Sequence, residues 1–209
     1  MDMLDGETSV RDYSLERLMM LSDGVFAIAL TLLALELRPP EHWDGHVGSL
    51  LKGASPTLYA FVLSFGSIGA QWASHRRSFG RFKRADFGLT AYKMIFLGLI
   101  VMVPPVTRAL TESRYEIGVV LLYIGLSVAI GLANLSIWCH AAFMSDILEP
   151  GATLRLKIVV ALLLAFVAPT MTTLGVLSSQ PRLHWLWILI PLVGFGMGAA
   201  RRWADPKQA

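Results

Sequence analysis

Six long apolar runs constrain this chain more than any other feature of its sequence. Each run ends in charged or turn-forming residues, such as Arg38-Pro39-Pro40 after the first and Glu149-Pro150-Gly151 after the fourth. A helix needs roughly 20 mostly apolar residues to cross the hydrocarbon core of a bilayer. The sequence therefore predicts an all-α membrane protein, one domain over residues 1–209, with six transmembrane helices at about 18–37, 53–74, 87–107, 117–144, 158–177 and 183–200.

The composition agrees with a membrane protein and excludes several other classes. Hydrophobic residues make up 55% of the chain and charged residues only 16%, whereas soluble domains carry about a quarter charged residues. This excludes a disordered chain and a basic nucleic-acid-binding domain, and the single cysteine, Cys139, excludes a disulfide scaffold. The sequence contains no phosphate-binding glycine loop, zinc-protease motif or serine elbow. We therefore expect no enzyme activity, no cofactor, no metal and no nucleic-acid partner.

Lysines and arginines outside the runs are distributed unevenly between the two sides of the predicted membrane. An even number of spans places both termini on one side, and that side carries twelve cations: Arg11, Arg17, Arg76, Arg77, Arg81, Lys83, Arg84, Arg155, Lys157, Arg201, Arg202 and Lys207. The other side carries five: Arg38, Lys52, Arg108, Arg114 and Arg182. Because cytoplasmic loops of membrane proteins are enriched in lysine and arginine, we expect a multi-pass protein with both termini in the cytoplasm.

Three ionisable residues lie in or at the edge of the predicted helices at similar depths. Asp23 and Lys93 lie about 9–10 Å inside the first and third helices at 1.5 Å per residue, and His75 lies at the cytoplasmic end of the second. Ionisable groups at such depths are costly and often functional. We expect a structural network in which Trp72, His75 and Lys93 hold Asp23, together with Ser22, through hydrogen bonds between helices.

The first predicted helix has one apolar face with a single hydroxyl group. At 100° per residue, five residues fall within about 100° of one another: Gly24, Ile28, Thr31, Leu32 and Leu35. The carboxylate of Asp23 lies on roughly the opposite side. Taken alone, such a face favours lipid contact or helix packing.

The same helix also contains a sequence motif. From Arg17 to Glu36 the sequence resembles the first-helix signature of the transmembrane protein 175-like potassium channels, R-x-x-x-F-S-D followed by G-V-F-A-I-A. The matching residues are Arg17, Ser22, Asp23, Gly24, Val25, Phe26, Ala27, Ile28, Ala29 and Thr31. The second helix adds Ser64-Phe65 and Trp72-x-x-His75, and the third adds Pro104 and Thr107.

The resemblance implies an architecture and a role for the apolar face. The resemblance to bacterial members implies a homotetramer of six-helix subunits, in which four copies of helix one line a central pore. By position, Ile28, Leu32 and Leu35 would form hydrophobic constrictions, and Thr31 would provide a hydroxyl layer for cation preference. Arg17 would belong to the structural polar network. The implied function is passive, potassium-preferring cation conduction across a bacterial inner membrane, without a carbonyl-lined filter loop.

Two residues depart from the family pattern, and two other functions remain open. Lys93 lies where relatives often carry an uncharged residue, and Leu21 replaces the phenylalanine of the signature. A relay through Asp23, His75 and Lys93 would instead suit a proton-conducting channel or a proton-coupled transporter. A non-conducting membrane scaffold would leave the apolar face of helix one as a packing surface.

Overall fold

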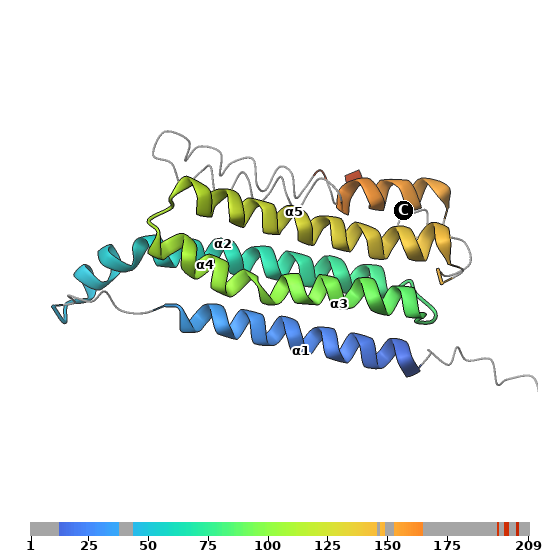
Figure 1. Cartoon of the computed structure of the whole chain (residues 1–209), viewed down its shortest axis with the longest axis horizontal. Helices are drawn as coiled ribbons and strands as arrows, with labels where there is room; N and C mark the ends of the chain where they lie inside the picture. The colour runs from blue at the N-terminus through green and yellow to red at the C-terminus, as the bar shows by residue number, and fades with distance from the viewer. Residues whose placement is uncertain are drawn as a thin grey trace, which may run out of the picture.

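The chain folds into a bundle of long helices that lie side by side (Figure 1). The computed structural model describes residues 13–37, 44–145, 147–148, 153–164 and four positions near the C-terminus, 196, 199, 200 and 204. The described helices are α1 (Tyr13–Leu35), α2 (Val47–Phe79), α3 (Phe87–Val101), α4 (Val103–Glu112), α5 (Ile117–Cys139) and the π-helical turn η1 (His140–Met144). Residues 154–164 are also helical. Most of the fifth and sixth predicted spans lies outside the described residues.

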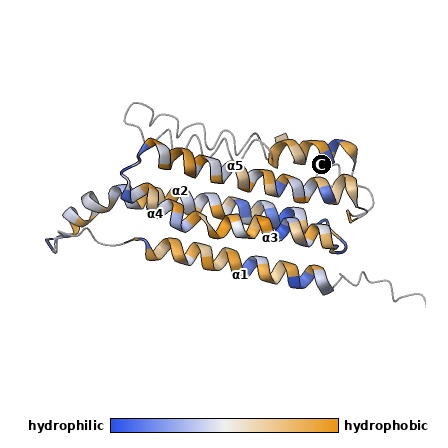
Figure 2. Cartoon of the chain, viewed as in Figure 1, coloured by the Kyte–Doolittle hydropathy of each residue, from blue (hydrophilic) through white to orange (hydrophobic). Residues whose placement is uncertain are grey.

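Three stretches of the described chain are long and apolar enough to cross a membrane. They are α1, the continuous α3–α4 stretch Phe87–Glu112, and α5 with η1, Ile117–Met144. Apolar residues dominate along these helices, and polar residues gather toward their ends (Figure 2). The last stretch has the bounds of the fourth predicted span.

Helix α2 is the longest of the described helices, yet it is not among these apolar stretches. Its 33 residues correspond to about 50 Å, which exceeds the thickness of a bilayer core. Its lower hydropathy has a structural cause, because its buried positions include Ser64, Gln71, His75 and Ser78. Polar residues that face other helices do not contact lipid, so a hydropathy criterion alone does not recognise such a helix as a membrane span. The span predicted at 53–74 remains a prediction.

The third predicted span is a broken helix that ends later than expected. The sequence predicted an end at residue 107, whereas the helix breaks at Met102 and continues to Glu112. Pro104 and Pro105 lack the backbone N–H groups that would donate to the preceding turn. At the break itself, Met102 N–H donates a hydrogen bond to Leu99 O at 3.2 Å. The break therefore follows from two consecutive prolines.

Helix α3 forms the centre of the described bundle, because it packs against α1, α4, α5 and η1. Four apolar residues on it are buried: Leu89, Phe96, Leu97 and Ile100. They join the main core with Phe26 of α1, Phe79 of α2 and Trp138 of α5. This core fixes the position of α1, the helix that carries the apolar face singled out from the sequence.

Candidate functional site

Helix α1 presents one face to its own subunit and leaves the opposite face uncovered. The buried face repeats every three or four residues, as expected for a helix packed along one side: Leu15, Leu18, Ser22, Phe26, Ala29 and Leu33. On the other face Ile28 is 58% exposed and Leu35 is 67% exposed. Thr31 and Leu32 are exposed on the same face. Within the part of the subunit that the structure describes, the apolar face singled out from the sequence is therefore not used for packing.

Thr31 holds its hydroxyl group in a defined orientation. Its Oγ1 donates a hydrogen bond to the carbonyl oxygen of Ile28 at 2.8 Å. The hydroxyl proton is thus engaged with the backbone, and the oxygen lone pairs remain available on the exposed face. An oxygen presented in this way can act as a ligand for a cation.

Asp23 connects α1 to α2. Trp72 Nε1 donates a hydrogen bond to Asp23 Oδ1 at 2.9 Å. The guanidinium of Arg76 lies over the Trp72 ring, 5.6 Å from its centroid, so three residues form one continuous chain of contacts. The other network residues behave differently: Ser22 donates to Leu18 O within α1 at 2.6 Å, and Arg17 lies over the ring of Tyr13.

Lys93 and His75 lie next to this contact but do not join it. The Lys93 side chain is fully buried, and within the described residues neither Lys93 Nζ nor His75 Nε2 has a hydrogen-bond partner. Lys93 Nζ lies 4.2 Å from the Phe79 ring centroid and 5.5 Å from that of Phe96. The His75 ring contacts the same two phenylalanines, tilted against Phe79 with the ring centroids 4.1 Å apart and parallel to Phe96 at 6.0 Å. Both side chains therefore lie against aromatic rings, and of the residues predicted to hold Asp23, Trp72 is the one that the described structure shows hydrogen-bonded to it.

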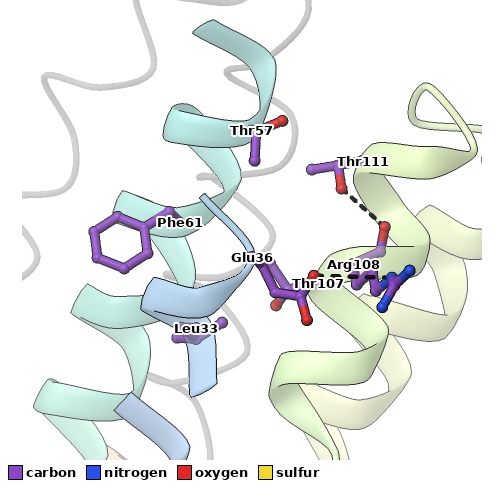
Figure 3. A pocket seen from close by; sticks show the side chains of 7 residues that line it. All are labelled: Leu33, Glu36, Thr57, Phe61, Thr107, Arg108 and Thr111. Atoms are coloured by element: carbon purple, nitrogen blue, oxygen red, sulfur yellow. Dashed lines mark hydrogen bonds and ion pairs between the residues drawn. The ribbon is translucent and has the colours of Figure 1, made fainter. Parts of the chain in front are cut away.

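The predicted outer end of α1 meets α2 and α4 in a small pocket (Figure 3). Arg108 Nε lies 2.7 Å from Glu112 and 3.8 Å from Glu36. The remaining lining residues are Leu33, Thr57, Phe61, Thr107 and Thr111. The charge of Glu36 is therefore partly neutralised by a cation of its own subunit.

Two buried hydrogen-bonded groups join α2 to the neighbouring helices. Ser64 Oγ lies 2.8 Å from both Thr107 Oγ1 and Tyr123 OH. Deeper in the bundle, Asn134 Nδ2 donates to Gln71 Oε1 at 3.3 Å. Buried polar groups on membrane helices need such partners, and these contacts satisfy Ser64 and Gln71, two of the polar residues that lower the hydropathy of α2.

A further polar cluster ties the start of α3 to the end of α5. Asp86 caps α3 by accepting a hydrogen bond from Leu89 N–H at 2.6 Å. Its carboxylate also lies 2.9 Å from His140 Nε2 and accepts from Ser145 Oγ at 2.9 Å. A side chain at Gly88 would clash with the His140 ring, since a Cβ there would lie 2.5 Å from Cε1. Glycine at this position is what allows the histidine to approach α3.

The surroundings of Asp86 determine its charge. Partial burial alone would raise the pKa of the carboxyl, but hydrogen bonds from Leu89 N–H, His140 and Ser145 outweigh this effect. The pKa of Asp86 therefore lies below its usual value of 3.8. The carboxylate is ionised at neutral pH, and its bonds to the neighbouring donors are charge-assisted.

Comparison with known proteins decides the family. A potassium channel of Chamaesiphon minutus is 37% identical over 141 residues, which cover 63% of this chain and 68% of that protein. The chain belongs to the TMEM175 family. The family described as endosomal/lysosomal potassium channel TMEM175 matches residues 17–104. A potassium channel of Streptomyces collinus is 32% identical over 134 residues, which cover 62% of this chain and 65% of that protein.

A solved structure supports the same TMEM175 assignment. The crystal structure of a lysosomal potassium-selective channel TMEM175 homologue from Chamaesiphon minutus superposes with a TM-score of 0.58 at 25% sequence identity. The superposition covers 93% of this chain and 97% of that one. The resemblance found in the α1 signature is thus confirmed, as are a multi-pass membrane protein with bacterial homologues and an ion-channel family that is not an enzyme.

Sequence reasoning missed the Asp86 cluster of this TMEM175 chain. Asp86 and His140 are 54 positions apart, and no short motif links them. One local signal was present: an aspartate directly before an apolar run is a typical helix N-cap. The sequence alone assigns no partner to His140, and a π-helical turn cannot be predicted from hydrophobic periodicity.

We expect Asp86→Asn to destabilise this TMEM175 subunit at neutral pH by about 1 kcal/mol, because asparagine can still cap α3 but loses the charge-assisted bonds. A lowered folded-state pKa stabilises the fold above pH 3.8, and this stabilisation is lost as the pH falls through the folded value. The difference in melting temperature between wild type and variant should therefore close below that pH. An exposed acid changed in the same way, Glu16→Gln, serves as the control. A pH-independent difference for Asp86→Asn would contradict this account.

Proposed function

We propose that four copies of this chain form a potassium-preferring cation channel in which α1 lines a central pore. One observation carries the proposal: the face of α1 that contains Ile28, Thr31, Leu32 and Leu35 is uncovered in the subunit, while the opposite face is fixed in the core. A fourfold axis along this face would place four copies of each side chain around one path. The relatives from Chamaesiphon minutus and Streptomyces collinus are potassium channels by name.

The constriction would control hydration rather than bind ions. A ring of isoleucine side chains offers no oxygen to replace the hydration shell of a cation, so such a ring conducts only when it widens and is closed when it dries. We propose Ile28 as the narrowest ring, with Leu32 and Leu35 beyond it. The four Thr31 oxygens, one turn away, would provide the ligands that favour potassium, which loses its hydration shell more readily than sodium.

The charges at the two ends of the bundle support an orientation with the N-terminus in the cytoplasm. The end that contains the start of α1 and the loop from α2 to α3 carries six exposed or half-exposed cations: Arg17, Arg76, Arg77, Arg81, Lys83 and Arg84. The opposite end carries Arg108 and Arg114 together with Glu36, Glu112 and Glu116. Positive charge favours the cytoplasmic side, so the N-terminal end of the α1 pore would open to the cytoplasm.

Reconstitution of the full chain into liposomes tests the function. We expect potassium flux down its gradient, and a reversal potential that follows the potassium gradient more closely than the sodium gradient. Absence of any cation flux from correctly inserted protein would favour a membrane scaffold instead.

Thr31→Val should lower the preference for potassium over sodium by about fivefold, equivalent to about 1 kcal/mol. Valine has nearly the shape of threonine but no oxygen on the pore side, so the conduction path stays open while the ligand layer is lost. Bi-ionic reversal potentials measure the change. Thr31→Ser keeps the hydroxyl group and should retain most of the preference. An unchanged ratio in the valine variant would remove Thr31 from the selectivity layer.

Proton conduction is the second candidate function, and two observations favour it. Within the described residues, Lys93 Nζ and His75 Nε2 are buried without hydrogen-bond partners, and ionisable groups inside a membrane protein often mark proton pathways. A bovine relative, 28% identical over 155 residues that cover 31% of that protein, is named an endosomal/lysosomal proton channel. A reversal potential that follows the pH gradient would favour this alternative over potassium conduction.

A further inference from the structure

The end of α2 and the loop to α3 concentrate positive charge that the same segment does not balance. Five cations lie within nine residues: Arg76, Arg77, Arg81, Lys83 and Arg84. From Val47 to Ala85 the sequence contains no aspartate or glutamate. Asp86 comes next, but its carboxylate is already bonded to Leu89, His140 and Ser145. Within the described ranges, no ion pair uses Arg76, Arg77, Lys83 or Arg84.

The backbone that carries these cations is held in place. Phe79 and Phe82 are buried in the core. Phe82 forms a β-bridge with Leu148, and Lys83 N–H donates to Ile147 O at 2.9 Å. The side chains of the four cations without ion pairs are nevertheless exposed. A fixed backbone with exposed cationic side chains is organised in advance to receive an anion.

The aromatic residues beside the cations indicate where that anion lies. The Arg76 guanidinium lies 5.6 Å from the centroid of the Trp72 ring. Phe87, the first residue of α3, is 89% exposed. Aromatic residues next to cations at the end of a membrane helix are typical of the bilayer interface. A small soluble anion would leave the Phe87 ring in water, whereas a lipid would cover the ring with its acyl chains.

We infer that Arg76, Arg77, Lys83 and Arg84 bind the phosphate of anionic lipid headgroups, with Phe87 inserted at the level of the upper acyl chains. Guanidinium groups present paired N–H donors that match phosphate oxygens. Clustered lysines and arginines next to a membrane helix attract anionic lipids. The site is independent of ion conduction, since it uses residues on the surface of α2 and its loop rather than the exposed face of α1.

Native mass spectrometry of the full chain in detergent tests this site. Short-chain phosphatidylglycerol should bind more tightly than phosphatidylcholine of the same chain length. The triple variant Arg76→Gln/Lys83→Gln/Arg84→Gln should weaken phosphatidylglycerol binding by roughly a hundredfold, at about fivefold per cation. It should leave phosphatidylcholine binding unchanged. High salt should weaken phosphatidylglycerol binding to the wild-type protein, which tests the proposal even if the variant does not fold.

The control is Arg114→Gln, an exposed arginine at the opposite end of the bundle, which should bind phosphatidylglycerol as the wild type does. Equal affinity of the wild type for the two lipids would overturn the proposal, as would undiminished phosphatidylglycerol binding by the triple variant. An equal loss in Arg114→Gln would show that only net charge matters. Displacement of the lipid by excess inorganic phosphate would reassign the site to a soluble anion.

Discussion

Replacing Ile28 with asparagine should raise potassium flux through the reconstituted channel by about tenfold or more, which corresponds to a barrier lowered by about 1.4 kcal/mol. The Ile28 side chain lies on the uncovered face of α1, so four copies would meet at the axis of the proposed tetramer. An amide ring can hydrogen-bond water where an isoleucine ring excludes it, so the narrowest point would stay hydrated. Liposome flux under a fixed potassium gradient measures the effect.

Two controls separate this effect from a general disturbance of the protein. Ile28→Val keeps the ring apolar and should change the flux far less than asparagine does. Leu121→Asn places the same amide on α5, where the side chain is 60% exposed but outside the proposed pore, and should leave flux unchanged. Equal flux in Ile28→Asn and wild type would remove Ile28 from the pore.

Lys93→Met should raise the free energy of unfolding by about 1–3 kcal/mol, because it removes a buried amine that has no hydrogen-bond partner. Methionine fills a similar volume and packs well against aromatic rings, and here those rings are Phe79 and Phe96. The substitution gives up the cation–π contact, which is worth about 2 kcal/mol when desolvated. We expect the cost of burying the charge to exceed this contribution.

Unfolding in one detergent, compared between variants, measures the stability change. Lys83→Met is the matched control, because Lys83 is exposed in the loop after α2 and should give almost no change. A lower stability of Lys93→Met would mean that the amine has a stabilising partner and would contradict its description as unpaired. Flux recorded on the same variant shows whether conduction needs the amine. Potassium flux that persists without it would argue against a relay through Lys93.

Local patterns in the sequence were sufficient to predict the character of α1. A motif spread over the segment from Arg17 to Thr31 indicated the family, and a helical repeat separated the exposed Ile28 and Leu35 from the far side of the helix. The Asp23–Trp72 contact was also predictable, because both residues lie near the same predicted membrane depth. Each of these inferences needs only one helix, or one helix and its neighbour.

Features that depend on three-dimensional packing could not be predicted in the same way. Depth alone placed Lys93 and His75 within reach of Asp23, but it could not show that both side chains lie against the rings of Phe79 and Phe96. The bond between Asp86 and His140 depends on the absence of a side chain at Gly88, which becomes meaningful only when two helices are side by side. Side-chain packing thus decided which polar groups pair.

The proposed pore depends most on which environment surrounds the exposed face of α1. Thiol accessibility tests that environment directly. In a background of Cys139→Ala, single cysteines at Leu32, Leu35 and Leu121 would be treated with a charged, water-soluble thiol reagent during flux recordings. We predict block of potassium flux for Leu32→Cys and Leu35→Cys and none for Leu121→Cys. Unmodified thiols and unchanged flux at both α1 positions would place that face against lipid or protein and contradict the proposed pore.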